Sequence, residues 1–312
     1  MEQQNSVVSP QADVSRIAPT RRPDREVVYK KIAQPNGGGD LQLHVYLPPN
    51  WKATDQRPAI VFFFGGGWRI YNPQQFYAKA EYLASRGMVA FCADYRVLTR
   101  HQTTFDSAME DARSALRCVR AQGRQWGVDG EKIVAAGGSS GGHLAAACAL
   151  LDGPDDSADD CKISCQPQAL VLFNPVLDLI AASRKGGHLT EVILIACPGD
   201  SDQAKKAALK KLSPFEYLRK NCPPTVMLFG ADDAWLPDAK VFAAKSRQLG
   251  NRVDTWIAPN MPHGFFNAAP WHQETLIKTD AFLASLGFLS GPPTIPSADP
   301  SAVLASYGEN AK

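Results

Sequence analysis

The chain has 312 residues, of which 45% are hydrophobic and 21% charged, and its formal net charge is +2. This composition is that of a globular protein with a sizeable core, long enough for one α/β domain or two small ones. A charge so close to neutral gives no general attraction for nucleic acid or for an anionic membrane, and no apolar run approaches the roughly 20 residues that cross a bilayer.

The N-terminal stretch 1–26 is predicted to be a polar arm that is partly disordered or lies along the surface. No apolar signal-peptide core occurs within 1–25, which predicts a cytoplasmic protein. The alternative is a secreted or periplasmic protein from which a leader has been removed.

The seven cysteines are an odd number, so at least one thiol is unpaired within the chain. Three lie in apolar stretches and are expected to be buried free thiols: Cys92, Cys118 and Cys148. A disulfide among the others is left open, with the candidates Cys161, Cys165, Cys197 and Cys222. None of these has a histidine at metal-ligand spacing, so we expect no metal site.

Strand patterns alternate with helix patterns along the chain. Short strands at 27–32 and 41–47 flank a glycine run and predict an antiparallel hairpin. Later strands are continuous apolar runs, typical of strands buried on both faces, at 59–64, 88–93, 169–173 and 225–229, with others opening at Ile133 and at 253–257. Helical patterns lie between them, at 76–86, at 105–122, in the alanine-rich stretch after Gly142, and at 273–286. The sequence therefore predicts an α/β fold, a mostly parallel sheet with helices on both faces.

The segment 177–221 is too long for an ordinary connection between a helix and a strand, which has about 2–6 residues. Helical patterns at 191–196 and 202–212 predict a small helical cap within one domain that spans 27–288. The Pro-, Ser- and Ala-rich stretch 289–312 is predicted to be a tail.

A strand that turns directly into a helix carries the pattern G-x-S-x-G, the nucleophile elbow in which small neighbours relieve a strained backbone. The pattern fits twice, with Ser139 between Gly137 and Gly141, or with Ser140 one residue later. Alone it is a weak signal, because a serine hydroxyl is a poor nucleophile until an imidazole takes its proton and a carboxylate orients that imidazole.

Candidates for these partners follow late strands. Three carboxylates come after the strand at 225–229, namely Asp232, Asp233 and Asp238, and His263 follows the strand at 253–257. The order serine, acid, histidine is the one expected in an α/β-hydrolase. Backbone N–H groups must also bind the oxyanion, and Gly65 to Gly67, directly after a buried strand, could supply them.

Five motifs in this order resemble the α/β-hydrolase fold, and within it the hormone-sensitive-lipase-like and the acetyl-xylan or feruloyl esterase groups. They are Gly65-Gly-Gly-Trp68, Asp94-Tyr-Arg96, Gly137-Gly-Ser-Ser-Gly-Gly-His-Leu-Ala145, Gly230-Ala-Asp-Asp-Ala-Trp-Leu-Pro237 and His263-Gly-Phe265. The resemblance covers about residues 27–288.

The resemblance implies a role for each matching position. Ser139 would be the nucleophile, His263 the base and Asp233 the acid, and the N–H groups of Gly66, Gly67 and Ser140 would form the oxyanion hole. The chain departs from the pattern at Phe64, where these families usually have a histidine that shapes the oxyanion loop.

Aromatic residues near these motifs have two interpretations. Trp68 and Tyr71 could line the acyl pocket or pack under the loop, and Phe265 could wall the alcohol side or belong to the core. His143, one turn into the elbow helix, is expected to be structural.

The sequence thus predicts a serine carboxylester hydrolase that uses an acyl-enzyme and no metal or organic cofactor. The resemblance implies a small-molecule or carbohydrate ester as substrate, with a short or aromatic acyl group, and neither nucleic acid nor a membrane span as partner. A general short-chain carboxylesterase is the nearest alternative, and a non-catalytic relative that binds a ligand in the same pocket is another. A peptidase of the prolyl-oligopeptidase type is disfavoured because no propeller domain precedes the catalytic region.

Overall fold

The computed structural model describes residues 17–32 and 39–308, so most of the predicted N-terminal arm and the glycine turn near residue 36 lie outside the described residues. Its centre is one nine-stranded sheet with the order β1-β2-β4-β3-β5-β6-β7-β8-β9. The strands are β1 Arg25–Lys30, β2 Leu41–Tyr46, β3 Arg57–Phe63, β4 Val89–Ala93, β5 Val128–Gly138, β6 Ala169–Phe173, β7 Thr225–Gly230, β8 Val253–Ala258 and β9 Ala305–Ser306.

The central strands of the sheet are parallel. From β4 through β3, β5, β6 and β7 to β8, each neighbour pairs in parallel, whereas β1 with β2 and β2 with β4 pair antiparallel. The predicted α/β architecture with an antiparallel opening pair is confirmed. Because the chain enters each parallel strand from the same side, the loops after β3, β5, β6, β7 and β8 meet at one edge of the sheet.

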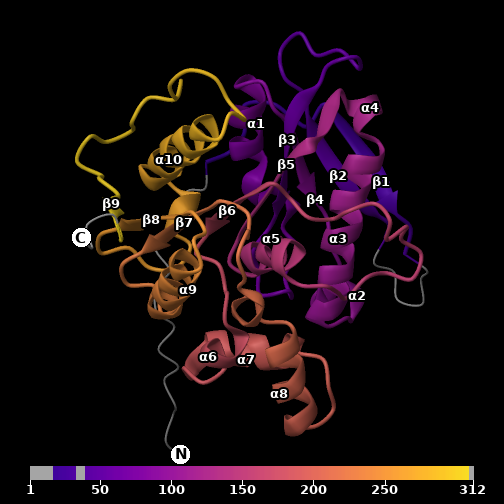
Figure 1. Cartoon of the computed structure of the whole chain (residues 1–312), viewed down its shortest axis with the longest axis vertical. Helices are drawn as coiled ribbons and strands as arrows, with labels where there is room; N and C mark the ends of the chain where they lie inside the picture. The colour runs from indigo at the N-terminus through magenta and orange to yellow at the C-terminus, as the bar shows by residue number, and fades with distance from the viewer. Residues whose placement is uncertain (1–16, 33–38, 309–312) are drawn as a thin grey trace, which may run out of the picture.

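Helices cover both faces of the sheet (Figure 1). One face packs against α3 Phe105–Ala121, α5 Ser140–Leu150 and α9 Leu236–Gln248, and the other against α1 Tyr77–Ser85 and α10 Trp271–Ser285. In β3 the alternation is visible in the core, since Val61 and Phe63 pack on the first face and Ile60 and Phe62 on the second. The remaining short helices are α2 Leu98–His101, α4 Gly123–Trp126, η1 Pro73–Phe76 and η3 Phe265–Asn267.

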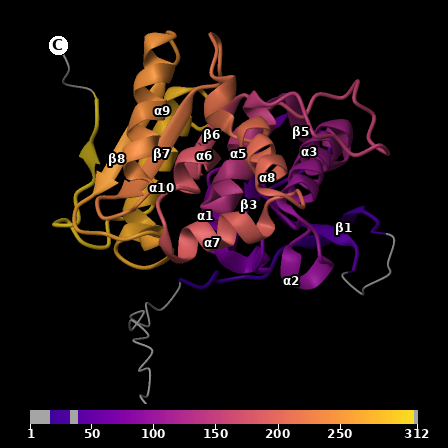
Figure 2. The ribbon, with the colours of Figure 1, turned by 90° about the horizontal axis from the view of Figure 1, so that it is seen from below.

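The segment between β6 and β7 forms a group of helices at one end of the molecule (Figure 1). It contains α6 Leu179–Ala182, α7 Gly187–Ala196, α8 Asp202–Lys211 and η2 Pro214–Tyr217. Figure 2 views the molecule from this end, with α7 and α8 in front of α5. We describe this segment as the cap.

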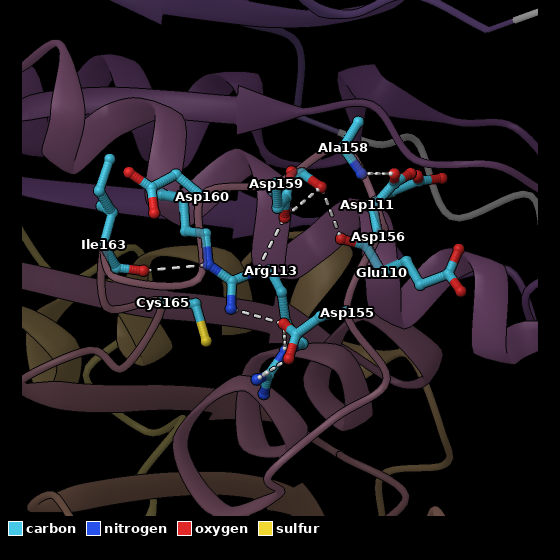
Figure 3. Close-up of polar contacts among 12 residues, drawn as sticks. Glu110, Asp111, Arg113, Asp155, Asp156, Ala158, Asp159, Asp160, Ile163 and Cys165 are labelled. Atoms are coloured by element: carbon cyan, nitrogen blue, oxygen red, sulfur yellow. Dashed lines mark hydrogen bonds and ion pairs between the residues drawn. The ribbon is translucent and has the colours of Figure 1, made fainter.

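The loop between α5 and β6 is held to α3 by a network of ion pairs (Figure 3). Asp155 accepts from Arg113 at 2.6 Å and from Arg117 at 2.5 Å, and Asp159 accepts from Arg117 at 2.8 Å. Lys30 of β1 joins Asp111 of α3 to the same loop. Both arginines are buried, so these ion pairs fix the loop against α3.

The packed region extends past residue 288, where the sequence predicted a tail. Leu289, Ala302 and Leu304 are buried, and β9 pairs antiparallel with β8. The side chain of Arg247 joins the two, because it donates to the carbonyl oxygens of Val253 and Tyr307. The segment covers what would otherwise be an open sheet edge.

All seven cysteines are free thiols, which answers the disulfide question left by the sequence. Cys118 is only half-buried, so the expectation of full burial holds for Cys92 and Cys148 but not for it. Within the described ranges, no helix is both long and apolar enough to span a membrane.

Candidate active site

Ser139 stands at the turn from β5 into α5. Its backbone is strained, with φ 54° and ψ −120°. Neighbouring backbone lies too close to Gly137 and Gly141 for a side chain at either position. A Cβ on Gly141 would lie 2.1 Å from the carbonyl oxygen of Phe63, and a Cβ on Gly137 would lie 2.4 Å from the carbonyl oxygen of Gly141. Of the two possible registers, the structure therefore places Ser139 at the apex and Ser140 as the first, fully buried residue of α5.

A chain of two hydrogen bonds connects Ser139 to a buried carboxylate. The Oγ of Ser139 is 2.9 Å from Nε2 of His263, and Nδ1 of His263 is 2.7 Å from Oδ2 of Asp233. A carboxylate only accepts, so Nδ1 carries the proton and Nε2 is free to accept from the serine hydroxyl. The other carboxylate oxygen of Asp233 accepts from the amide of Trp235 at 2.9 Å, which fixes the carboxylate in turn.

The structure separates the three candidate acids. Asp233 has a fully buried side chain directly behind the imidazole. Asp232 is exposed, and Asp238 pairs with Lys185 of the cap at 3.0 Å. Only Asp233 among the three contacts His263.

The glycine loop after β3 lies beside Ser139. Gly66 and Gly67 have positive φ angles of 138° and 63°, and a Cβ on Gly67 would lie 2.2 Å from Val192 of α7. Within the described chain, the amides of Gly66 and Gly67 donate to no backbone or side-chain acceptor. The amide of Ser140, at the first position of α5, has no acceptor within the helix. These N–H groups are the ones predicted to meet an oxyanion.

Phe64 fits the loop in place of the usual histidine. Its ring stacks on Tyr95 at 4.1 Å between centroids, and the Tyr95 hydroxyl donates to the Phe64 carbonyl oxygen at 2.7 Å. The Asp94-Tyr-Arg96 motif thus braces the loop: Asp94 accepts from Tyr71, and Arg96 pairs with Asp111 of α3.

A cavity of 310 Å³ opens at Ser139. It is lined by the loop Gly65 to Ile70, by Val192 and Ile193 of the cap, and by Gln75, Ser139, Asn174, Trp235, His263, Gly264, Phe266 and Asn267. Trp68 reaches this lining but is only 1% exposed, because its ring packs on Phe105 and His143.

Two residues that the sequence proposed for substrate binding do not line this cavity. The hydroxyl of Tyr71 donates to Asp94 at 2.8 Å and its ring packs on Phe64, so the side chain belongs to the loop's support. Phe265 packs on Phe266 and Trp271 in the core beside α10. Phe266 and Trp235 line the cavity instead.

Three polar residues of the site were not predicted from the sequence. Asn174 follows β6, is fully buried, and places its Nδ2 at 3.2 Å from Nε2 of His263, while its Oδ1 accepts from the amide of Gly264. Gln75 accepts from the amide of Gly65 and donates to Asn267, whose side chain donates to the Gly264 carbonyl. Gln75 and Asn267 thereby link the glycine loop to the histidine loop. For Asn174 a signal existed, because it directly follows a buried strand at the edge where the other site residues lie.

The chain matches a known protein family. The family model BD-FAE matches residues 43–249. The chain belongs to the BD-FAE family. Among curated relatives of this BD-FAE member, carboxylesterase/phospholipase LipF of Mycobacterium tuberculosis is 27% identical over 273 residues, which are 80% of the chain and 66% of LipF. Esterase LipQ of the same organism is 26% identical over 243 residues, 75% of the chain and 56% of LipQ. The BD-FAE chain thus spans about half to two thirds of the length of the curated relatives it matches.

Solved structures similar to the BD-FAE chain include those of esterase 2 from Thermogutta terrifontis. The structure phosphorylated by paraoxon is 38% identical with a TM-score of 0.75, covering 86% of this chain and 95% of that one. The propionate-bound structure is 39% identical with a TM-score of 0.75, covering 86% and 96%. The predicted α/β-hydrolase fold and the predicted resemblance to carboxylic ester hydrolases are confirmed, since the relatives and these neighbours are named esterases.

Proposed function

We propose that the protein is a serine carboxylester hydrolase that works through an acyl-enzyme on Ser139. The observation that carries this proposal is the unbroken contact from Asp233 through His263 to Ser139, with distances of 2.7 Å and 2.9 Å. Ser139 opens onto a cavity beside glycine amides that donate to no acceptor in the described chain.

In this mechanism Ser139 attacks the ester carbonyl while Nε2 of His263 takes the hydroxyl proton. His263 then passes that proton to the leaving alcohol, and Asp233 stabilises the imidazolium in between. The amides of Gly66, Gly67 and Ser140 bind the oxyanion of each tetrahedral intermediate. Water, deprotonated by His263, releases the acid and regenerates the serine.

The size of the cavity supports a short acyl group. Its volume of 310 Å³ lies at the lower end of the range for small-molecule sites, about 300–1,000 Å³. Thermogutta esterase 2 has been solved with propionate and with butyrate bound, which favours a short-chain carboxylesterase. A short or aromatic acyl ester of a carbohydrate is the finer proposal, and it rests on the resemblance to acetyl-xylan and feruloyl esterases.

Hydrolysis of p-nitrophenyl acetate tests the proposal. Ser139→Ala should lower kcat by about 10³-fold or more, because the attacking oxygen is lost. Ser140→Ala is the matched control and should keep most of the activity, since only its backbone amide takes part. Equal activity in the wild type and Ser139→Ala, or an inert wild type, would refute the assignment.

A substrate panel tests the finer proposal. It compares acetylated xylo-oligosaccharides and methyl ferulate with p-nitrophenyl esters of increasing chain length. A higher kcat/KM for the sugar or feruloyl esters supports a carbohydrate ester as substrate, whereas a preference for acetate to butyrate esters of any alcohol supports the general short-chain carboxylesterase.

A further inference from the structure

Arg69 follows the glycine loop by two residues and lines the same cavity as Ser139. Its backbone is fixed on both sides. The amide of Arg69 donates to the Gly66 carbonyl at 3.1 Å, and the Arg69 carbonyl accepts from the amide of Thr99 at 3.2 Å. The base of this long side chain is therefore held at a set position relative to the amides that would bind the oxyanion.

The guanidinium of Arg69 donates to no acceptor among the residues that the structure describes. Its Nε is buried without a hydrogen-bond acceptor in the described part of the chain, and no carboxylate there lies within ion-pair distance of the side chain. Other arginines that are at least half-buried do have acceptors: Arg86 pairs with Asp280, Arg113 with Asp155, and Arg120 donates to carbonyl oxygens. The two Nη groups of Arg69 are not among the buried atoms and donate to no acceptor in the described part of the chain either, so they are open to a partner that arrives with a ligand.

The cavity offers Arg69 no counter-charge. No aspartate or glutamate occurs among the described residues that line it, and Asp233 is shielded behind His263. The planar guanidinium presents a fork of N–H donors that matches a carboxylate, and partial burial strengthens that attraction.

We propose that Arg69 binds a carboxylate on the substrate, so that the preferred substrates are short esters with a carboxylate near the scissile bond. This inference rests on the proposed ester hydrolysis and adds the charge of the substrate to it. The carboxylate could belong to either half of the ester: to the acyl group, as in a dicarboxylic acid monoester, or to the alcohol, as in an acetylated uronic acid.

Two matched pairs of esters test this proposal and distinguish the two halves. On the acyl side, monoethyl glutarate is compared with ethyl 5-oxohexanoate, which replaces the carboxylate by an acetyl group of similar size. On the alcohol side, acetylated galacturonate is compared with acetylated galactose. We expect the wild type to prefer the anionic member of at least one pair in kcat/KM.

Arg69→Met keeps most of the stem and removes the charge. It should lower the anionic-to-neutral ratio of kcat/KM by about 10-fold or more, the factor that corresponds to a lost charge-assisted hydrogen bond. Arg69→Lys should restore part of that ratio. The control is Arg100→Met, which removes an exposed cation near the same loop, stacked on Tyr71 and outside the cavity lining, and should leave the ratio unchanged.

Inhibition by glutarate provides a readout that does not depend on turnover of the anionic esters. Measured with p-nitrophenyl acetate as substrate, its inhibition constant should rise by about 10-fold in Arg69→Met. A wild type without anionic preference, or an Arg69→Met variant that loses both members of each pair equally, would overturn the inference. If p-nitrophenyl acetate is still cleaved in a Ser139-dependent manner, that failure concerns Arg69 alone; if it is not cleaved, the proposed function fails as well.

Discussion

Asn174 donates to the same imidazole nitrogen that faces the nucleophile. With Nδ1 of His263 bonded to Asp233, Nε2 of the neutral ring can accept from both Ser139 and Asn174. The orientation of the Asn174 amide follows from its other contact, because its Oδ1 accepts from the Gly264 N–H. The Asn174 amide therefore presents a donor to Nε2, and a carboxylate at the same position would present an acceptor instead.

Asn174→Asp should therefore move the acid limb of the kcat/KM profile to higher pH, by about one pH unit. The new carboxylate still accepts from the Gly264 amide, but its second oxygen faces Nε2 of His263 and stabilises the protonated ring. Because only the neutral ring can act as the base, activity is then lost at a higher pH. Aspartate also tolerates the positive φ of 37° at this position. The measurement is kcat/KM for a neutral ester across the acid range.

Asn267→Asp is the control for the added charge. Asn267 lines the same cavity but contacts Gln75 and Gly264 rather than the ring, so its acid limb should shift less. Equal shifts in the two variants would contradict a specific role of the Asn174 contact.

The sequence was sufficient to predict the residues whose role requires a particular backbone position. It was not sufficient to predict which aromatic side chains line the cavity, because that depends on packing. Ser139 needs glycine neighbours, and His263 and Asp233 must follow particular strands, so spacing exposes all three. Tyr71 and Phe265 could equally face a pocket or the core, and the direction of a ring is decided by distant neighbours such as Asp94 and Trp271.

At the scale of elements, α5 is joined to the cap by a buried histidine. Nε2 of His143 donates to the carbonyl of Leu212, the residue after α8, at 2.9 Å, and its ring packs edge-on against Trp68. Burial lowers the pKa of His143 from 6.5 to about 4. The folded protein therefore keeps this ring neutral over a range in which the unfolded chain binds a proton.

The contribution of His143 to stability is consequently present above about pH 6.5 and is lost as the pH falls towards 4. Between about pH 7 and pH 5 the wild type should lose about 2 kcal/mol more free energy of unfolding than His143→Gln, whose amide can still donate to Leu212 but does not titrate. Urea unfolding at both pH values measures the difference. The other histidines contribute equally to the pH dependence of both proteins, so they do not affect the difference. Parallel pH dependences of the two free energies of unfolding would contradict this role of His143.

The predicted helix boundaries were most accurate where the helical period of apolar residues is strongest. The helix predicted at 105–122 is α3 Phe105–Ala121, and the pattern at 202–212 is α8. The cap helix α7 begins at Gly187, four residues before the predicted 191, because glycine at its start weakens the pattern. Helices α2, α4 and α6 span only four residues each, too few to show a helical period.

At the scale of the whole molecule, the parallel sheet was predictable because strands buried on both faces leave continuous apolar runs. The C-terminal segment was not, since a strand of two residues in a Pro- and Ser-rich stretch has no signal of its own, and its partner is β8. The same limit applied to the loop after α5: its acidic residues gave no sign that Arg113 and Arg117 of α3 would bind them.

One edge of the sheet brings a serine, an imidazole and a carboxylate into contact. From this arrangement we expect Ser139 to be the only serine that is activated as a nucleophile. Paraoxon tests this directly, because attack on its phosphorus releases p-nitrophenolate and leaves the diethylphosphoryl group on the attacking oxygen. Peptide mapping by mass spectrometry should find one adduct, on Ser139, in the wild type and in Ser140→Ala, and none in Ser139→Ala. An adduct on Ser140, or ester hydrolysis that persists with Ser139 unmodified, would contradict it.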